Sequence, residues 1–253
     1  MKKLTRIGLL ALIILSFSQC TAPKKEENTS PETPAVVLPQ LTEAQKAEGW
    51  QLLFDGQSLT GWQIFKDREN NTWEVSDGVI HCKALDETTT GVGDKRSDIM
   101  TSTEYGNFEF SFEWKIATQG NSGVMFRVAE ELEQPYYTGP EYQLIDDAGF
   151  PDETPDHLTG ANYGMHAPKN AKTKPAGDWN SSKLVVNKNH VEHWLNGDKV
   201  VEYELNSPEW IALKKAGKWK DAEKYGALEM GHIVLQDHGS EAWFRNIMIK
   251  ELR

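Results

Sequence analysis

The 253-residue sequence contains only two cysteines, Cys20 and Cys82, so it has no disulfide framework. It has no glycine-rich phosphate loop, no cysteine and histidine spacing typical of zinc sites, and no Gly-x-Ser-x-Gly motif. Internal repeats are also missing. These absences argue against nucleotide-dependent enzymes, zinc hydrolases, α/β-hydrolases and repeat proteins.

Positive charge is in short supply as well. The chain has 27 Lys and Arg residues against 38 Asp and Glu, which gives a net charge of -11. Because cationic side chains supply most of the attraction to phosphates, we expect neither nucleic acid nor anionic lipid headgroups as a partner.

The one long apolar run, residues 7–15, follows three basic residues at the N-terminus and is too short to span a bilayer. We therefore predict a signal peptide over residues 1–19. Cys20 would then be the lipid-modified first residue of an exported cell-envelope lipoprotein, periplasmic or attached to the outer membrane. Gln19 departs from the small residue usual before such a cysteine, and residues 16–18 offer an ordinary cleavage site as the alternative.

Residues 20–40 are rich in Pro, Glu, Lys, Thr and Ser, with almost nothing to bury, which predicts a disordered tether. A folded domain is predicted over residues 41–253. About a dozen short apolar–polar alternations at hairpin spacing, with no βαβ rhythm, indicate an all-β sandwich or jelly roll. One or two short helices are expected, with candidates over residues 41–49 and from Ser207 to near Gly217.

The clearest strand pattern covers residues 107–117, where an apolar row from Phe108 to Ile116 alternates with a polar row that includes Glu113. Two further segments, residues 139–147 and 231–239, each combine an apolar row with a polar row of acid, amide and imidazole. If the apolar rows share one core, their polar partners share the opposite face, namely Glu113, Arg127, Glu141, Gln143, Gln236 and His238. A solvated sheet face is the plain alternative for each of these residues.

Other candidates lie at strand ends and in loops. Asp146 and Asp147 follow the first polar strand, and Asp237 follows the second. The loop over residues 150–174 is unusually long and carries His157, and loops of this length often serve function.

Six groups of motifs resemble the 3-keto-disaccharide hydrolase domain, a family of exported bacterial proteins, over roughly residues 48–252. They are Trp50–Gly56 with Leu59–Trp62, Asn121–Arg127, Glu141–Asp146, Asp178–Asn180, Trp194–Gly197, and Leu235–Gly239 with Phe244–Ile247. The resemblance implies a concanavalin A-like jelly-roll β-sandwich and cleavage of glycosides oxidised at C3. It also implies pocket roles for Glu141, Gln143, the Arg127 region and residues 236–238.

A carbonyl at C3 acidifies the C2 proton, so a base can remove it while the C1 aglycone leaves, and water then adds back. We expect Glu141 or His238 to be the base and Asp146 to protonate the leaving oxygen. Arg127 would polarise the carbonyl, with a divalent cation held by Asp146 or Asp147 as the alternative. No metal ligand set is assigned. The expected substrate contacts are Asn121, Gln143, Gln236, Glu113, His157 and Trp179.

The rival hypothesis is a lectin-like lipoprotein that binds sugar without turning it over, with Trp62, Trp73 or Trp179 as a stacking platform. A purely structural envelope lipoprotein would leave the polar rows without an explanation.

Overall fold

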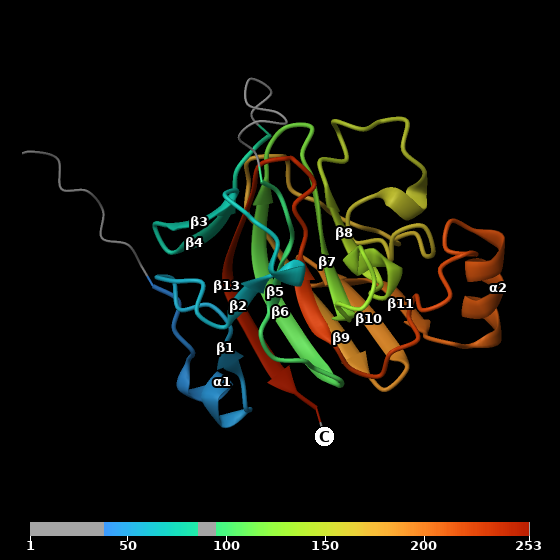
Figure 1. Ribbon diagram of the computed structural model, residues 1–253, viewed down its shortest axis with the longest axis horizontal. Helices are drawn as coiled ribbons and strands as arrows, with labels where there is room; N and C mark the ends of the chain where they lie inside the picture. The colour runs from blue at the N-terminus through green and yellow to red at the C-terminus, as the bar shows by residue number, and fades with distance from the viewer. Residues whose placement is uncertain (1–37, 86–94, 253) are drawn as a thin grey trace, which may run out of the picture. The chain divides into compact units, whose positions relative to one another are not determined.

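Two antiparallel sheets form the framework of the computed structural model, which describes residues 38–85 and 95–252 (Figure 1). The predicted signal peptide, Cys20 and most of the tether lie outside the described residues. The eight-stranded sheet has the path β11 (Asp198–Glu204), β10 (His190–Leu195), β9 (Asn180–Asn187), β6 (Phe108–Ile116), β13 (Ala242–Glu251), β4 (Val79–Cys82) and β3 (Trp73–Ser76), with β1 (Gln51–Leu52) paired to β13. The five-stranded sheet has the order β2 (Trp62–Ile64), β5 (Ile99–Thr101), β12 (His232–Leu235), β7 (Asn121–Val128) and β8 (Glu141–Ile145).

The two sheets pack face to face, and Figure 1 shows β7 and β8 in front of β6, β9 and β10. Their inner faces supply one apolar core, which contains the predicted Phe108–Ile116 row together with Tyr142, Leu144, Ile233 and Leu235. Burial of these rows is the main source of stability of such a sandwich. The predicted all-β jelly-roll sandwich is therefore confirmed.

Both predicted helices are present. α1 (Glu43–Ala47) begins after Thr42, whose side chain caps it, and α2 (Pro208–Ala216) begins after Ser207, whose hydroxyl accepts a hydrogen bond from the Trp210 N–H. Three 3-10 turns complete the elements, η1 (Phe65–Asp67), η2 (Pro135–Tyr137) and η3 (Pro155–His157). None of the helices in the described part of the chain has the length and apolar character needed to span a membrane.

The outer face of the five-stranded sheet is partly covered. Phe65, Met100, Met125, Val128 and Val234 form a second, smaller apolar cluster there, and Tyr136 of η2 packs against it. Beyond this cluster the same face turns polar, and this polar part holds the candidate site.

Candidate active site

A cavity of about 220 Å³ opens on the outer face of the five-stranded sheet. Its lining comes from two strands, the residues after β12, and three segments that cover the sheet. The lining residues are Asn121, Tyr136, Glu141, Gln143, Tyr163, Lys218, Trp219, Gln236 and His238. Five of the residues expected from the sequence, Asn121, Glu141, Gln143, Gln236 and His238, thus meet at one place.

Strand register explains why the acid and the amides meet. Gln143 on β8 lies opposite Gly123 on β7, whose carbonyl accepts the backbone N–H of Gln236. Glu141 lies two residues along β8 from Gln143, and its carboxyl group lies over Gly123. A Cβ atom at Gly123 would collide with that carboxyl group. The missing side chain of Gly123 therefore provides the space in which this carboxyl group sits.

Three amide oxygens in the cavity have no hydrogen-bond partner among the described residues. They are Asn121 Oδ1, Gln143 Oε1 and Gln236 Oε1, all shielded from solvent. A buried acceptor without a donor costs free energy, so these oxygens indicate a ligand that supplies donors. Sugar hydroxyl groups would satisfy them.

Glu141 has an unusual electrostatic environment. Its side chain is 4% exposed, and burial raises the pKa of its carboxyl group to about 8. Lys218 and a hydrogen bond with Gln236 act in the opposite direction, while the Asp98 charge adds to the rise in pKa. Such a carboxyl group can exchange a proton near neutral pH.

Lys218 is the matching cation at the rim of the cavity. Its ammonium group lies 4.2 Å from the centre of the Tyr163 ring and 5.0 Å from that of Trp219. Partial burial lowers the pKa of Lys218, and the nearby Glu141 carboxylate opposes that shift. The cavity thus contains a carboxyl group and an ammonium group, together with an aromatic wall.

That wall is formed by Tyr136, Tyr163 and Trp219, which come from three covering segments. The backbone N–H of Tyr163 donates to the Glu141 carbonyl at 3.0 Å, so the long loop runs along the free edge of β8. Trp219 stacks on Tyr225 and donates its indole N–H to the Tyr163 carbonyl at 2.9 Å. Flat aromatic faces suit the C–H faces of a sugar ring.

Arg127 does not reach this cavity. Its guanidinium group donates to the carbonyls of Gly106 and Lys188, at 3.0 Å and 2.7 Å, and is 3% exposed. A β-bulge is the reason: Val128 pairs with His232 and Met125 with Val234, so two residues of β7 lie opposite Ile233 alone. Arg127 takes a positive φ of 52° at this bulge and leaves the face that simple alternation predicts.

Asp146 also lies outside the cavity. It shares the alternation of Tyr142 and Leu144 rather than that of Glu141, and its carboxylate accepts the Gln119 N–H at 2.9 Å. The Asp147 carboxylate accepts hydrogen bonds from the Thr159 N–H and the Thr173 hydroxyl group. Both aspartates hold turns and loops together.

Glu113 belongs to the other sheet, and Trp179 immediately precedes strand β9 of that sheet. Glu113 lies on β6, where it pairs with Arg245 at 2.7 Å, and the Arg245 guanidinium group stacks over the Trp179 ring at 4.0 Å. His157 stacks on Tyr163 at 4.3 Å, which places it behind the aromatic wall rather than in the cavity. The expected convergence therefore holds for five of the ten candidate residues.

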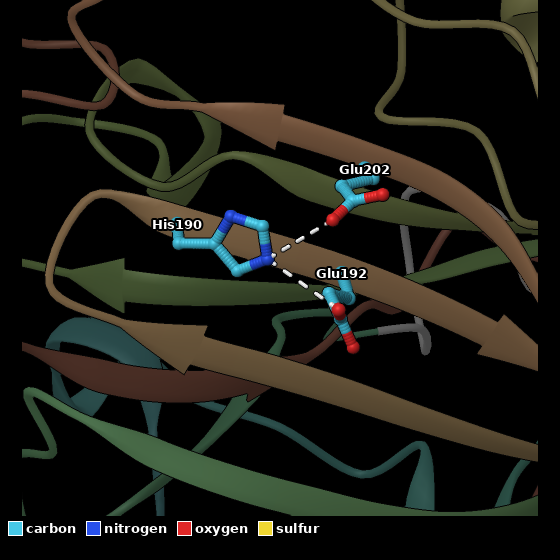
Figure 2. A group of neighbouring side chains, drawn as sticks. All are labelled: His190, Glu192 and Glu202. Atoms are coloured by element: carbon cyan, nitrogen blue, oxygen red, sulfur yellow. Dashed lines mark hydrogen bonds and ion pairs between the residues drawn. The ribbon is translucent and has the colours of Figure 1, made fainter.

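A separate cluster, His190, Glu192 and Glu202, has the residue types of a metal site. Figure 2 shows His190 Nε2 between Glu192 and Glu202, at 3.4 Å and 3.3 Å from their nearest oxygens. The Lys199 ammonium group already pairs with both carboxylates, at 3.1 Å and 2.7 Å. An exposed ion-pair network accounts for this cluster without a metal.

Sequence reasoning missed Tyr136, Tyr163, Lys218 and Trp219, which form the wall and rim. Three of them belong to the abundant aromatics of the chain, but nothing in their spacing separates them from core residues. Only the fold of the covering segments brings them to the strands.

Residues 49–250 match the family described as the 3-keto-alpha-glucoside-1,2-lyase-like domain. This chain belongs to that family. A 3-keto-disaccharide hydrolase of Bacteroides thetaiotaomicron is 33% identical over 233 residues, which cover 81% of this chain and 79% of that protein.

Solved structures agree with the family assignment. A crystal structure from Parabacteroides distasonis, assigned as a glycosyl hydrolase, has 38% identity and a TM-score of 0.77, and the match covers 86% of this chain and all of that one. A second structure from the same organism has 27% identity and a TM-score of 0.61, over 80% and 99% of the two chains. The resemblance found in the sequence is thereby confirmed, and the chain is a glycoside-cleaving enzyme of this family.

Proposed function

We propose that this enzyme cleaves 3-keto-glycosides, including 3-keto-disaccharides, in the cavity around Glu141. The family and the name of the Bacteroides relative support this substrate class. The cavity of about 220 Å³ is smaller than the roughly 300–1,000 Å³ of sites for drug-sized ligands, so it suits one sugar ring.

The observation that carries the proposal is that the buried Glu141 carboxyl group and the Lys218 ammonium group line the same cavity and interact electrostatically. In a 3-keto sugar the acidic C2–H and the C3 carbonyl are on adjacent carbons, so a base and a cation side by side can act on both. Glu141 in its ionised form takes the C2 proton. Lys218 hydrogen-bonds the C3 oxygen, where negative charge develops.

The electrons balance over two stages. As the C2–H bond breaks, its electron pair forms the C1–C2 double bond, and the C1–O bond breaks with its pair remaining on the aglycone oxygen, which takes a proton. Water then adds its oxygen to C1, and C2 regains a proton from Glu141. The products are the free 3-keto sugar and the aglycone.

The amide groups and aromatic rings hold the substrate. Asn121, Gln143 and Gln236 accept hydrogen bonds from sugar hydroxyl groups, and the wall packs against the ring. His238, exposed at the mouth, contacts the substrate where it enters.

The test is incubation of the enzyme with a panel of 3-keto-glycosides and their unoxidised parents, with and without chelator, followed by measurement of free 3-ketoglucose. We expect product from the keto forms only. Glu141→Gln should lower kcat by at least 10²-fold while the circular dichroism spectrum is retained. Glu223→Gln, which changes an exposed carboxylate, is the matched control and should keep full activity.

Two outcomes would contradict the proposal. If native trehalose or sucrose were cleaved as fast as their 3-keto forms, the keto group would not be needed for the reaction. If sugars bind, no product forms, and Glu141→Gln changes affinity alone, the chain is a lectin-like binding protein.

We also propose that the chain is exported and anchored to the cell envelope through a lipid on Cys20. The basic start, short apolar run and polar tether of the sequence support this placement.

A further inference from the structure

Asp98, which no sequence motif marks, lies beside the candidate site. β5 pairs with β12 through Val234 opposite Met100 and Leu235 opposite Ile99, so the next residue, Asp98, continues the row opposite Gln236. Ile99 belongs to the inner core and Met100 to the outer apolar cluster. Because side chains alternate, Asp98 lies on the outer face with Met100 and Gln236.

One row of the sheet therefore runs from Asp98 to Gln236, Gly123 and Gln143. Two strand spacings, roughly 10 Å, separate the backbones of Asp98 and Gly123. The Glu141 carboxyl group lies over Gly123. Glu141 and Asp98 thus lie on either side of Gln236, a separation that a sugar ring and its glycosidic oxygen can bridge.

The contacts of Asp98 leave it available for chemistry. Oδ1 accepts the Asp237 backbone N–H at 2.7 Å, while Oδ2 has no hydrogen bond within residues 38–85 and 95–252. The neighbouring Asp237 carboxylate, by contrast, is fully buried and accepts hydrogen bonds from the Arg96 Nε–H at 2.9 Å and the Thr72 hydroxyl group at 2.7 Å. Both carboxylate oxygens of Asp237 thus accept hydrogen bonds, whereas among the described residues Asp98 uses only Oδ1.

The surroundings of Asp98, above all its burial, favour the protonated form of its carboxyl group near neutral pH. Burial raises the pKa of Asp98 to about 7, the Asp237 N–H bond lowers it, the Asp237 charge raises it, and the Arg68 charge lowers it. The other titratable groups that face it are Glu141 of β8, Tyr136 of η2 and Cys82 of β4.

We infer that Asp98 is the general acid that protonates the leaving aglycone oxygen, and the base that activates the incoming water. This inference rests on the proposed function and fills the role that Asp146 cannot fill from its position. As the C1–O bond breaks, the Asp98 proton passes to the departing oxygen while Glu141 takes the C2 proton. In the second stage Asp98 takes a proton from the water that bonds to C1, and Glu141 returns its proton to C2, so both groups regain their starting states.

The test compares two substrates, the methyl and the 4-nitrophenyl 3-keto-glucosides. A nitrophenolate leaves without protonation, whereas a methoxide requires it. Asp98→Asn keeps the Oδ1 acceptor for the Asp237 N–H and removes only the proton. The readout is aglycone release in a single turnover, because this step precedes the hydration stage, which uses Asp98 on both substrates. We expect this variant to release methanol at least 10²-fold more slowly than the parent and nitrophenol less than 10-fold more slowly.

Asp77→Asn, in the exposed β3–β4 turn, is the matched control and should behave as the parent on both substrates. Glu141→Gln should lose both activities, because departure of either group requires removal of the C2 proton. Thermal melting of each variant checks that the fold is retained.

The pH profile gives a second readout on the methyl glycoside. Glu141 must be ionised and Asp98 protonated, so kcat/KM of the parent should peak between about pH 7 and 8 and fall on both sides. For Asp98→Asn on the nitrophenyl glycoside the alkaline fall should vanish, leaving a rise to a plateau above about pH 8.

Each remaining outcome overturns the inference. Equal losses on the two substrates would show that Asp98 positions the site rather than donating a proton, and unchanged activity on both would remove it from the chemistry. If the leaving-group effect appears in His238→Ala instead, His238 is the acid. A parent enzyme that cleaves neither substrate would refute the proposed function and the acid role together.

Discussion

At the scale of single residues, one side chain dominates the site. Glu141 was predicted from alternation along a strand, and its burial together with the space over Gly123 gives its carboxyl group an environment that a surface acid lacks. A buried ionisable group is a stability cost that catalytic sites commonly carry. The cost can be measured, because it depends on pH.

We predict that Glu141→Gln stabilises the fold. The folded-state pKa of about 8 lies above the usual 4.5, so the folded parent binds more protons than the unfolded chain between these values. The parent therefore loses stability as pH rises through this window, whereas the variant does not. The gain in free energy of unfolding should be near zero below pH 4.5 and approach about 5 kcal/mol above pH 8.

Urea unfolding from pH 4 to 9 checks this difference. Glu223→Gln provides the baseline, since its carboxylate is exposed. A Glu141→Gln curve parallel to the parent curve at every pH would mean that Glu141 titrates normally.

At the scale of elements, β7 shows how one extra residue redirects a side chain. The bulge opposite Ile233 moves Arg127 off the outer face and lets it tie the strand to two backbone carbonyls. A second feature is the loop over residues 150–174, which hydrogen-bonds along the free edge of β8. These hydrogen bonds place Tyr163 at the cavity. Side-chain alternation along a strand predicts neither the bulge nor the packing of this loop.

Arg127→Met should therefore affect stability and leave substrate binding intact. It removes the donors to the Gly106 and Lys188 carbonyls, and we expect a loss of about 1–3 kcal/mol in free energy of unfolding. KM and kcat per folded molecule should stay within twofold of the parent. Arg245→Met, which breaks a partly exposed pair with Glu113, should cost less than about 1 kcal/mol. A large fall in kcat for Arg127→Met without a change in melting temperature would indicate that Arg127 acts in catalysis, contrary to this prediction.

At the scale of the whole molecule, the acidic chain joins a predicted export segment to a β-sandwich whose cavity suits a neutral sugar ring. The described residues, 38–85 and 95–252, belong to one compact unit that contains the site. The proposed anchor precedes this unit in the sequence, so anchoring and catalysis should be separable by mutation.

We predict that Cys20→Ala moves the protein from the membrane fraction to the soluble fraction of the cells that produce it, because the variant cannot accept a lipid. Immunoblots of the fractions and the melting temperature of the released protein provide the measurement. Release with unchanged turnover supports the anchor. Equal membrane retention of parent and variant contradicts it.

The sequence by itself determined the sandwich, because period-two rows of apolar residues need a covering layer and the chain has too few helical segments to provide one other than a second sheet. It also determined that Glu141, Gln143, Gln236 and His238 lie on a polar row, since alternation is a local property of the backbone. Tertiary structure alone decided which rows face one another. Glu113 and Glu141 both alternate with core residues, yet they lie on different sheets, because strand order depends on long-range pairing that no local pattern encodes. For the same reason Tyr163, Lys218, Trp219 and Asp98 become part of the site or its border only when distant segments pack together.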